Sequence, residues 1–118
     1  MMITFRTFIL RWNYRKPVAA AQRYIDSTVL RLSDPYIPKD TGMLIRSGTL
    51  HTRIGSGQVR YVTPYAANVY YHNRGRGRNG MNSSAGGLRG RLWFLRMKAD
   101  KLLQILRGAQ RAAERNIR

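Results

Sequence analysis

The sequence predicts an α+β fold class, in which a small antiparallel β-sheet packs with an N-terminal helix and a long C-terminal amphipathic helix. Three observations predict it. Apolar residues recur at helical spacing over 18–32 and again over 92–117, and between them two runs of strand-forming residues flank a glycine-rich turn. With 118 residues, the chain suits a single domain spanning 1–118 and has no room for two full cores.

The N-terminal part of the chain predicts a strand and then a helix. Residues 1–12, MMITFRTFILRW, are rich in β-branched and aromatic residues, which favour a strand. Pro17 suits the first turn of the helix, and the SDP sequence at 33–35 ends it, because the residue before a proline avoids helical geometry. The apolar stripe of this helix consists of Val18, Ala21, Ile25, Val29 and Leu32.

An ordered loop is predicted over 35–42. Its structural turn consists of Pro38, Asp40, Thr41 and Gly42. The side chains of Asp40 and Thr41 can accept hydrogen bonds from local backbone amides, and Gly42 permits a positive φ. We expect this turn to direct the next segment into the sheet.

A β-hairpin is predicted after the loop. Apolar positions alternate towards the end of 43–55, turn residues occupy 55–58, and strand formers resume at 59–65. Pro64 cannot donate to a ladder, so it marks a strand end or an edge. The next segment, AANVYYHN at 66–73, is compatible with a helix or a strand.

The last two elements are a basic loop and a long helix. Residues 73–91 have no periodic apolar face and are rich in glycine and arginine, which predicts a flexible loop. From Leu92 onwards an amphipathic helix of about 25 residues is expected, in which Gly108 is a point of weakness or bending. We expect its apolar face to meet the core or a subunit interface and its basic face to be solvated. The apolar face consists of Leu92, Leu95, Ala99, Leu102, Leu103, Leu106, Ala109, Ala113 and Ile117.

The charge of the chain points to an anionic partner. Lys and Arg number 22 against five acidic residues, a formal net charge of +17. A small domain with this charge is expected beside a polyanion or an acidic protein. The alternative is a protein that is merely basic.

The sequence has few residues that could form a catalytic or a metal-binding site. The five carboxylates are scattered without an evident facing pair, and the two histidines lie 21 residues apart, without the further ligands that a metal site needs. The absence of cysteine excludes disulfides and thiolate sites, and no run approaches the roughly 18 apolar residues of a membrane span. We therefore expect no catalytic residue, no metal, no cofactor, no signal peptide and no membrane association.

Two groups of residues are candidate binding sites. The arginines of the basic loop can each reach a phosphate oxygen, while the alternative is a solvated loop tip. They are Arg74, Arg76, Arg78, Arg89 and Arg91. Aromatic residues and a methionine are the candidates for a subunit or partner interface, although base stacking by the tyrosines and core packing at the helix start are open alternatives. These are Tyr65, Tyr70, Tyr71, Trp93, Phe94 and Met97.

Three segments, in this order, resemble the neck proteins of tailed phages, a family described as minor capsid or tail-completion proteins. YIPKDTGMLIRSG at 36–48 resembles their Tyr-(Val/Ile)-Pro-x-x-Thr-Gly-x-Leu-x-x-Ser segment. VRYVTPYAANVYY at 59–71 resembles their Tyr-x-x-Pro-Tyr-Ala segment with its tyrosine pair. RLWFLRMKAD at 91–100 is similar to the start of their C-terminal helix. The basic loop departs from the family pattern, in which this region is often longer and carries Trp or acidic residues.

The resemblance implies a non-enzymatic virion protein with a curved antiparallel sheet and packed helices. It would be made in the host cytoplasm and assemble at the head–tail junction as a homo-oligomeric ring, beside other neck, connector and tail proteins. Genome DNA in the ring channel is a further candidate partner. Two alternatives stay open: a stand-alone basic nucleic-acid-binding protein and, less favoured, a small nuclease.

Overall fold

The computed structural model describes residues 2–4, 15–84 and 86–116. Along the chain come strand β1 (Met2–Thr4), helix α1 (Arg15–Ser33), the short 3-10 helix η2 (Asp34–Tyr36), helix α2 (Met43–His51), strand β2 (Gln58–Arg60), helix α3 (Ala66–His72) and helix α4 (Trp93–Glu114). The fold is therefore mixed and rich in helix. Most of the segment predicted as an N-terminal strand, 5–12, lies outside the described residues.

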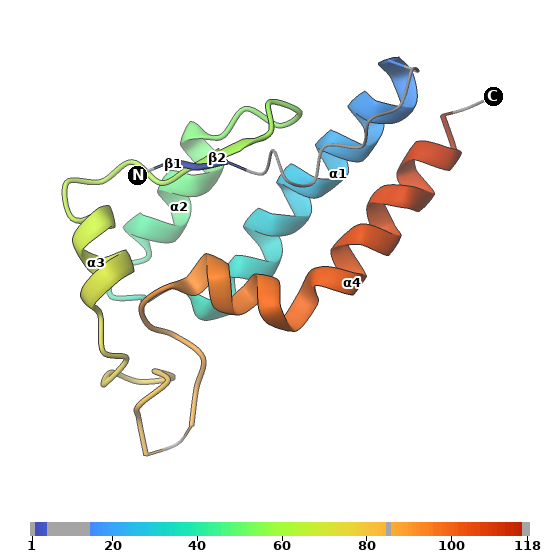
Figure 1. Cartoon of the computed structure of the whole chain (residues 1–118). Coiled ribbons are helices and arrows are strands. Elements are labelled where there is room, and N and C mark those ends of the chain that lie inside the picture. Colours follow the sequence, from blue (N-terminus) through green and yellow to red (C-terminus); the bar gives the residue numbers. More distant parts are fainter. Residues whose placement is uncertain (1, 5–14, 85, 117–118) are drawn as a thin grey trace.

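Helix α1 confirms the predicted N-terminal helix and begins two residues before Pro17. Three positions of its predicted stripe, Ala21, Ile25 and Val29, are at most 2% exposed. Figure 1 shows α4 lying antiparallel beside α1, and this pair forms the most extensive contact between elements of the described chain. The core therefore lies mainly between these two helices and extends under the segments that join them. Its fully buried large side chains include Ile25, Val29, Ile37, Val59, Tyr61, Trp93, Met97 and Ile105.

The prediction of a β-hairpin after the loop is wrong. The segment predicted as its first strand forms α2, whose buried residues Leu44, Ser47 and Gly48 follow helical spacing. Gly48 permits this packing, because a Cβ there would meet the ring of Tyr61. The alternation that suggested a strand involved Leu50, which is 77% exposed.

The small antiparallel sheet that the sequence predicted is not shown among the described residues. Strand β2 pairs instead with β1 in an antiparallel ribbon of three residue pairs, Met2 with Arg60, Ile3 with Val59 and Thr4 with Gln58. The turn predicted at 55–58 therefore connects α2 to β2 rather than joining two strands. The segment left open at 66–73 is helical as α3.

Helix α4 confirms the predicted C-terminal helix, with 22 residues, but its buried face was predicted only in part. Trp93, Phe94, Met97 and Ile105 are buried, followed by the small residues Gly108, Ala109 and Ala113. Leu95, Leu103 and Leu106, which the prediction assigned to the core or a subunit interface, are 53%, 65% and 38% exposed, so they do not belong to the core of the chain. The aromatic and small residues fit against α1 and the tyrosines, so the leucines face outward.

Candidate polyanion-binding loop

The basic loop, residues 73–91, is tied at both ends to the same place in the fold. The Arg91 amide donates to the Asn73 carbonyl at 2.9 Å, and the Leu92 amide donates to the Tyr70 carbonyl at 2.7 Å. The Gly90 amide donates to the Tyr36 carbonyl at 3.0 Å. The ends of the basic loop are therefore close together, and Figure 1 shows the loop projecting beyond the helices.

Backbone hydrogen bonds also cross the interior of the basic loop. The Met81 amide donates to the Arg89 carbonyl at 2.8 Å, and the Arg89 amide donates to the Asn79 carbonyl at 3.0 Å. Glycine permits the close approach of backbone segments within the loop, since a Cβ on Gly80 would meet the carbonyl of Gly75. The glycines therefore serve packing within the loop, a role that the prediction of a flexible loop did not include. Its mobility stays a prediction.

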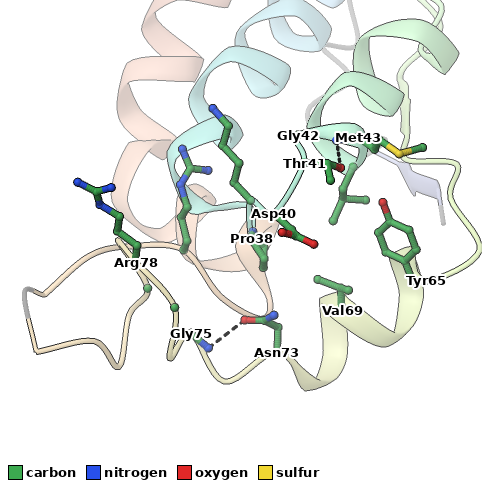
Figure 2. A pocket seen from close by; sticks show the side chains of 15 residues that line it. Pro38, Asp40, Thr41, Gly42, Met43, Tyr65, Val69, Asn73, Gly75 and Arg78 are labelled. Carbon is green, nitrogen blue, oxygen red and sulfur yellow. Dashed lines mark hydrogen bonds between the residues drawn. The ribbon is translucent and has the colours of Figure 1, made fainter.

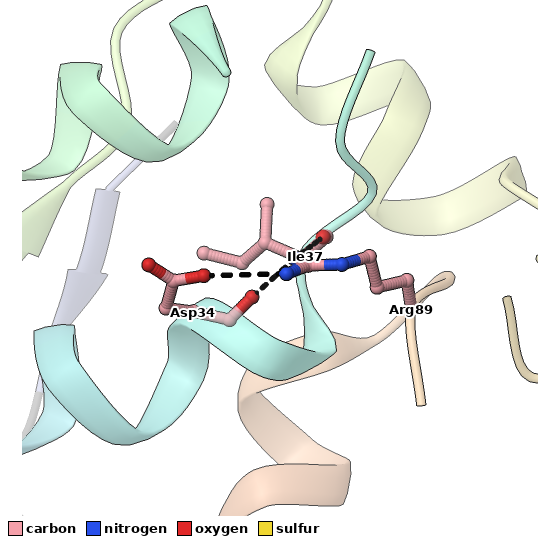
Figure 3. Close-up of polar contacts among 3 residues, drawn as sticks. All are labelled: Asp34, Ile37 and Arg89. Atoms are coloured by element: carbon pink, nitrogen blue, oxygen red, sulfur yellow. Dashed lines mark hydrogen bonds and ion pairs between the residues drawn. The ribbon is translucent and has the colours of Figure 1, made fainter. Parts of the chain in front are cut away.

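Arg89 fixes the basic loop to the end of η2. Its Nη1 donates to the carbonyls of Asp34 and Ile37, both at 2.6 Å, and its Nη2 lies 3.5 Å from the Asp34 carboxylate (Figure 3). The Arg89 side chain is only 17% exposed. A cation here also complements the partial negative charge of the carbonyls at the C-terminal ends of α1 and η2. The prediction that Arg89 faces a polyanion is therefore corrected: its guanidinium points into the protein.

Arg96, on the first turn of α4, holds the other side of the basic loop. Its Nε donates to the Arg91 carbonyl at 2.8 Å, and its Nη1 donates to the Leu88 carbonyl at 2.6 Å. Its guanidinium also lies over the ring of Tyr36, 5.6 Å from the centroid, as a cation–π contact. Burial lowers the pKa of Arg96 from its usual value. Sequence reasoning did not single out Arg96, because its spacing along α4 resembles that of solvated arginines.

The other four predicted arginines remain available to a ligand. Arg74, Arg76, Arg78 and Arg91 are exposed. The first three alternate with glycine or asparagine on one limb of the basic loop, and Arg91 stands at its base. Guanidinium groups spaced along a projecting, internally bonded loop can contact successive phosphates or carboxylates with little ordering of the backbone. We call Arg74, Arg76 and Arg78 the loop arginines.

A groove of about 540 Å³ lies between the predicted structural turn, α3 and the basic loop (Figure 2). Leu44, Val69 and Tyr65 give it apolar walls. In Figure 2 the Asp40 carboxylate points into this space, while the Arg78 guanidinium is directed outward.

The structural turn beside the groove forms as predicted in part. The Thr41 hydroxyl oxygen accepts a 3.3 Å hydrogen bond from the Met43 amide, and Gly42 has a φ of 83°. Arg46 adds a contact that was not predicted, donating to the Thr41 carbonyl at 3.2 Å. The turn starts α2, because its last residue is the N-cap of that helix, and so it does not lead into a sheet.

The predicted interface residues divide into an exposed pair and a core group. Tyr65 and Tyr71 are 40% and 57% exposed. The other four are buried inside the chain, so the structure places them in the core rather than on a surface. They are Tyr70, Trp93, Phe94 and Met97.

Trp93 is the centre of an aromatic cluster within the hydrophobic core, to which the segments 36–48, 59–71 and 91–100 all contribute residues. The ring of Tyr70 packs edge-on against Trp93 at 4.6 Å between centroids, and Tyr61 does so at 5.6 Å. One turn along α4 from Arg96, the Asp100 carboxylate accepts a 2.5 Å hydrogen bond from the hydroxyl of Tyr36. Burial, together with this hydrogen bond and the charge of Asp100, raises the pKa of Tyr36 to about 12.

Asp26 is a buried polar residue that sequence reasoning treated as scattered. It is fully buried, and its Oδ2 accepts hydrogen bonds from the amides of Gly55 and Gly57 at 2.7 and 3.1 Å, while its Oδ1 accepts one from Gln22 at 2.8 Å. It thus binds the turn before β2 to α1. The available signal was the spacing of Gln22 and Asp26, four residues apart on a helix.

Comparisons of the chain with protein-family models, curated proteins and solved structures find no match. Over the part of the chain that the structure describes, no three His, Asp or Glu side chains lie together as a metal site would require. Within the same residues, no helix has the length and apolar character needed to cross a bilayer.

Proposed function

We propose that this chain is a structural, non-enzymatic neck protein of a tailed-phage virion. In this proposal it completes the tail and joins it to the head connector, as one subunit of a homo-oligomeric ring around the DNA channel. It is made in the host cytoplasm and is located at the head–tail junction of the finished virion. The proposal includes the small antiparallel sheet expected of the family, for which the β1–β2 ribbon supplies the first pair.

The observation that carries the proposal is the meeting of three distant segments in one cluster. Tyr36 comes from the first family-like segment, Tyr61 and Tyr70 from the second, and Trp93 from the third. Tyr61 and Tyr70 contact Trp93 directly, and Tyr36 reaches the same helix through Asp100. Segments that resemble a family in order along the chain also lie together in space, which supports a shared architecture rather than three chance likenesses.

The basic loop gives the proposal its second support. The aromatic cluster and the clamps of Arg89 and Arg96 hold the base of this loop, and the loop arginines project from it. In a ring each of these charges is repeated once per subunit, so a few arginines become a dense positive collar. Such a collar suits DNA in a channel or an acidic neighbour in the neck.

The test is to inactivate the gene in the phage genome that carries it and to image the lysate by electron microscopy. The proposal expects filled heads separated from tails, with infectivity restored by supplying the chain in trans. Joined, infectious particles made without the chain would overturn the proposal.

A second candidate is a nucleic-acid-binding protein that acts alone. The net charge of +17 and the exposed loop arginines favour it, since neither requires a virion. Light scattering on the purified chain with duplex DNA distinguishes it from the first candidate when combined with the gene test. Tight binding by monomers, together with intact particles in the absence of the gene, would favour the stand-alone protein.

A further inference from the structure

Helix α4 has a second apolar face that its own core does not use. Leu95, Ala99, Leu103 and Leu106 follow one another at steps of four, four and three residues, so they form one line along the helix. We call this line the leucine stripe. Leu95 and Leu103 are 53% and 65% exposed, Leu106 is 38% exposed, and Ala99 is also exposed.

The leucine stripe differs from single exposed leucines, which are common on protein surfaces. Leu50, for example, is 77% exposed on α2 without such a line of apolar neighbours on its helix. The opposite side of α4 is already filled, since Trp93, Met97 and Ile105 are fully buried against the rest of the chain. A helix that is apolar on two sides fits between two packing partners, and here only one of them belongs to the described chain.

The charge around the leucine stripe determines which partner fits. Helix α4 carries five basic residues and two acidic ones, a net charge of +3. Arg107 and Arg111 are exposed, and Arg107 lies one turn beyond Leu103. Both acids already accept hydrogen bonds within the chain, Asp100 from Tyr36 and Glu114 from Gln110. The free charge beside the stripe is therefore positive.

A second copy of the chain is disfavoured as the occupant. It would place the positively charged α4, net charge +3, directly against a second α4 of the same sign. Like charges brought together across an interface oppose association and select against that partner. An amphipathic helix with leucines on one side and glutamates or aspartates along its edges matches both the apolar line and the positive border.

We propose that the leucine stripe of α4 docks an acidic amphipathic helix of a different protein. The inference does not depend on the proposed neck function, because it rests on α4 alone. The partner's leucines cover Leu95, Leu103 and Leu106, and its carboxylates pair with Arg107 and Arg111.

The test uses three fluorescent synthetic helices that match α4 in length, 22 residues. The first has leucines at the stripe spacing, flanked by glutamates. The second keeps the glutamates but has alanine for leucine, and the third keeps the leucines but has lysine for glutamate. Fluorescence anisotropy with the full chain should show the first peptide binding at least about tenfold more tightly than either of the others.

Variants of the chain then locate the binding. Replacing both Leu95→Gln and Leu103→Gln should weaken binding of the first peptide about tenfold. The matched control is Leu50→Gln, an equally polar change at a more exposed leucine on another helix, and it should have no effect. Binding of duplex DNA should be the same in all of these proteins, which separates the stripe from the loop arginines.

Four results would overturn the inference. Equal binding of the leucine and alanine peptides would mean that charge alone attracts them, and equal loss in the Leu50→Gln control would mean that the stripe is not the site. Self-association in sedimentation velocity that the double variant abolishes would identify a second copy as the occupant. A large fall in the melting temperature of the double variant would show that the chain itself covers the stripe.

Discussion

At the scale of single residues, the structure gives several side chains roles that their types alone do not reveal. Two arginines from the most basic part of the chain, Arg89 and Arg96, donate to backbone carbonyls of the protein instead of facing a ligand. A carboxylate, Asp26, is fully buried and binds the amides of a glycine turn. The hydrogen bonds of Asp26 with the glycine turn and of Arg89 with Asp34 join parts of the chain 29 and 55 residues apart, so local sequence patterns do not indicate them.

The tyrosines of the core predict a loss of stability in alkali. Burial raises the pKa of Tyr36 to about 12, and burial also raises the pKa values of Tyr61 and Tyr70. Because the folded state holds these protons more tightly than the unfolded state, where the phenol pKa is about 10, their contribution is complete below pH 10. For Tyr36 it should be lost as the pH rises from about 10 to about 12.

Urea denaturation at a series of pH values measures this effect. The free energy of unfolding should fall with rising pH above about 10, and Tyr36→Phe should make that fall shallower. Tyr65→Phe is the matched control, because Tyr65 is 40% exposed. If Tyr36→Phe and wild-type protein show the same dependence on pH, the phenol of Tyr36 does not gain its proton affinity from the fold.

At the scale of elements, the close approach of α1 and α4 depends on Gly108. Tyr24 of α1 faces Gly108 of α4, and a Cβ on Gly108 would meet the ring and hydroxyl of Tyr24. Replacing glycine by alanine inside a helix normally stabilises by about 1 kcal/mol. Here Gly108→Ala should destabilise instead, by about 1–3 kcal/mol, because the added methyl overpacks the contact.

A double-mutant cycle with Tyr24→Ala checks the cause. The penalty of Gly108→Ala, measured by thermal unfolding, should shrink or change sign once the Tyr24 ring is removed. The exposed position Ala99 supplies a control, where Ala99→Gly should cost only the propensity difference of about 1 kcal/mol. An equal penalty for Gly108→Ala with and without the Tyr24 ring would place its cause elsewhere.

The clamp of Arg89 should matter more to folding than any exposed arginine of the same loop. Arg89→Met keeps most of the side-chain volume but removes the guanidinium donor from the carbonyls of Asp34 and Ile37, and the Asp34 carbonyl then keeps the Ile37 amide at 3.2 Å. Loss of charge-assisted hydrogen bonds of this kind costs about 1.5–3 kcal/mol each. Arg76→Met, at an exposed position, should leave the free energy of unfolding unchanged.

Limited trypsin digestion adds a second measurement for Arg89. The basic loop should be cut faster at its remaining arginines in Arg89→Met than in Arg76→Met, because the loop has lost its attachment to η2. Equal stability and equal digestion rates in the two variants would show that the Arg89 clamp does not hold the loop.

Helices with a clear apolar period could be predicted from the sequence, and contacts between distant segments could not. The stripe of Ile25 and Val29 predicted α1 correctly, and the apolar residues after 91 predicted α4. The alternation of apolar positions around Leu50 led to the wrong prediction of a strand. The segment is helical, and the buried side of α2 consists of Leu44, Ser47 and Gly48. A short segment that mixes β-branched, small and polar residues fits either period, so tertiary packing decides its structure.

The candidate site was predictable in composition but not in geometry. The loop arginines are exposed, as a ligand-binding role requires, whereas Arg89 turns inward and donates to the carbonyls of Asp34 and Ile37 at the end of η2. The aromatic residues chosen as an interface are core residues where the three family-like segments meet, as Trp93 and Tyr70 show. An arginine that binds a ligand and one that caps a helix end look alike in a sequence.

At the scale of the whole molecule, the fold places the aromatic core and the exposed loop arginines in separate regions. Most of the aromatic residues that the structure describes are buried in the core, which fixes the ends of the basic loop to η2, α3 and α4. The loop arginines are then displayed on a short, internally bonded loop away from that core (Figure 1). The central claim is that these arginines, more than the general charge of the protein, contact a polyanion.

Binding of duplex DNA as a function of salt tests that claim most directly. The loop variant carries Arg74→Ser, Arg76→Ser and Arg78→Ser, and the control carries Arg23→Ser, Arg31→Ser and Arg53→Ser at exposed positions outside the basic loop. Both lose three charges, so their net charge is +14, from 17 − 3.

The plot of log K against log salt should become shallower by about 2.7 in the loop variant, from three lost phosphate contacts at about 0.9 each, and should change little in the control. Equal slopes in the two variants, whether both reduced or both unchanged, would contradict the account.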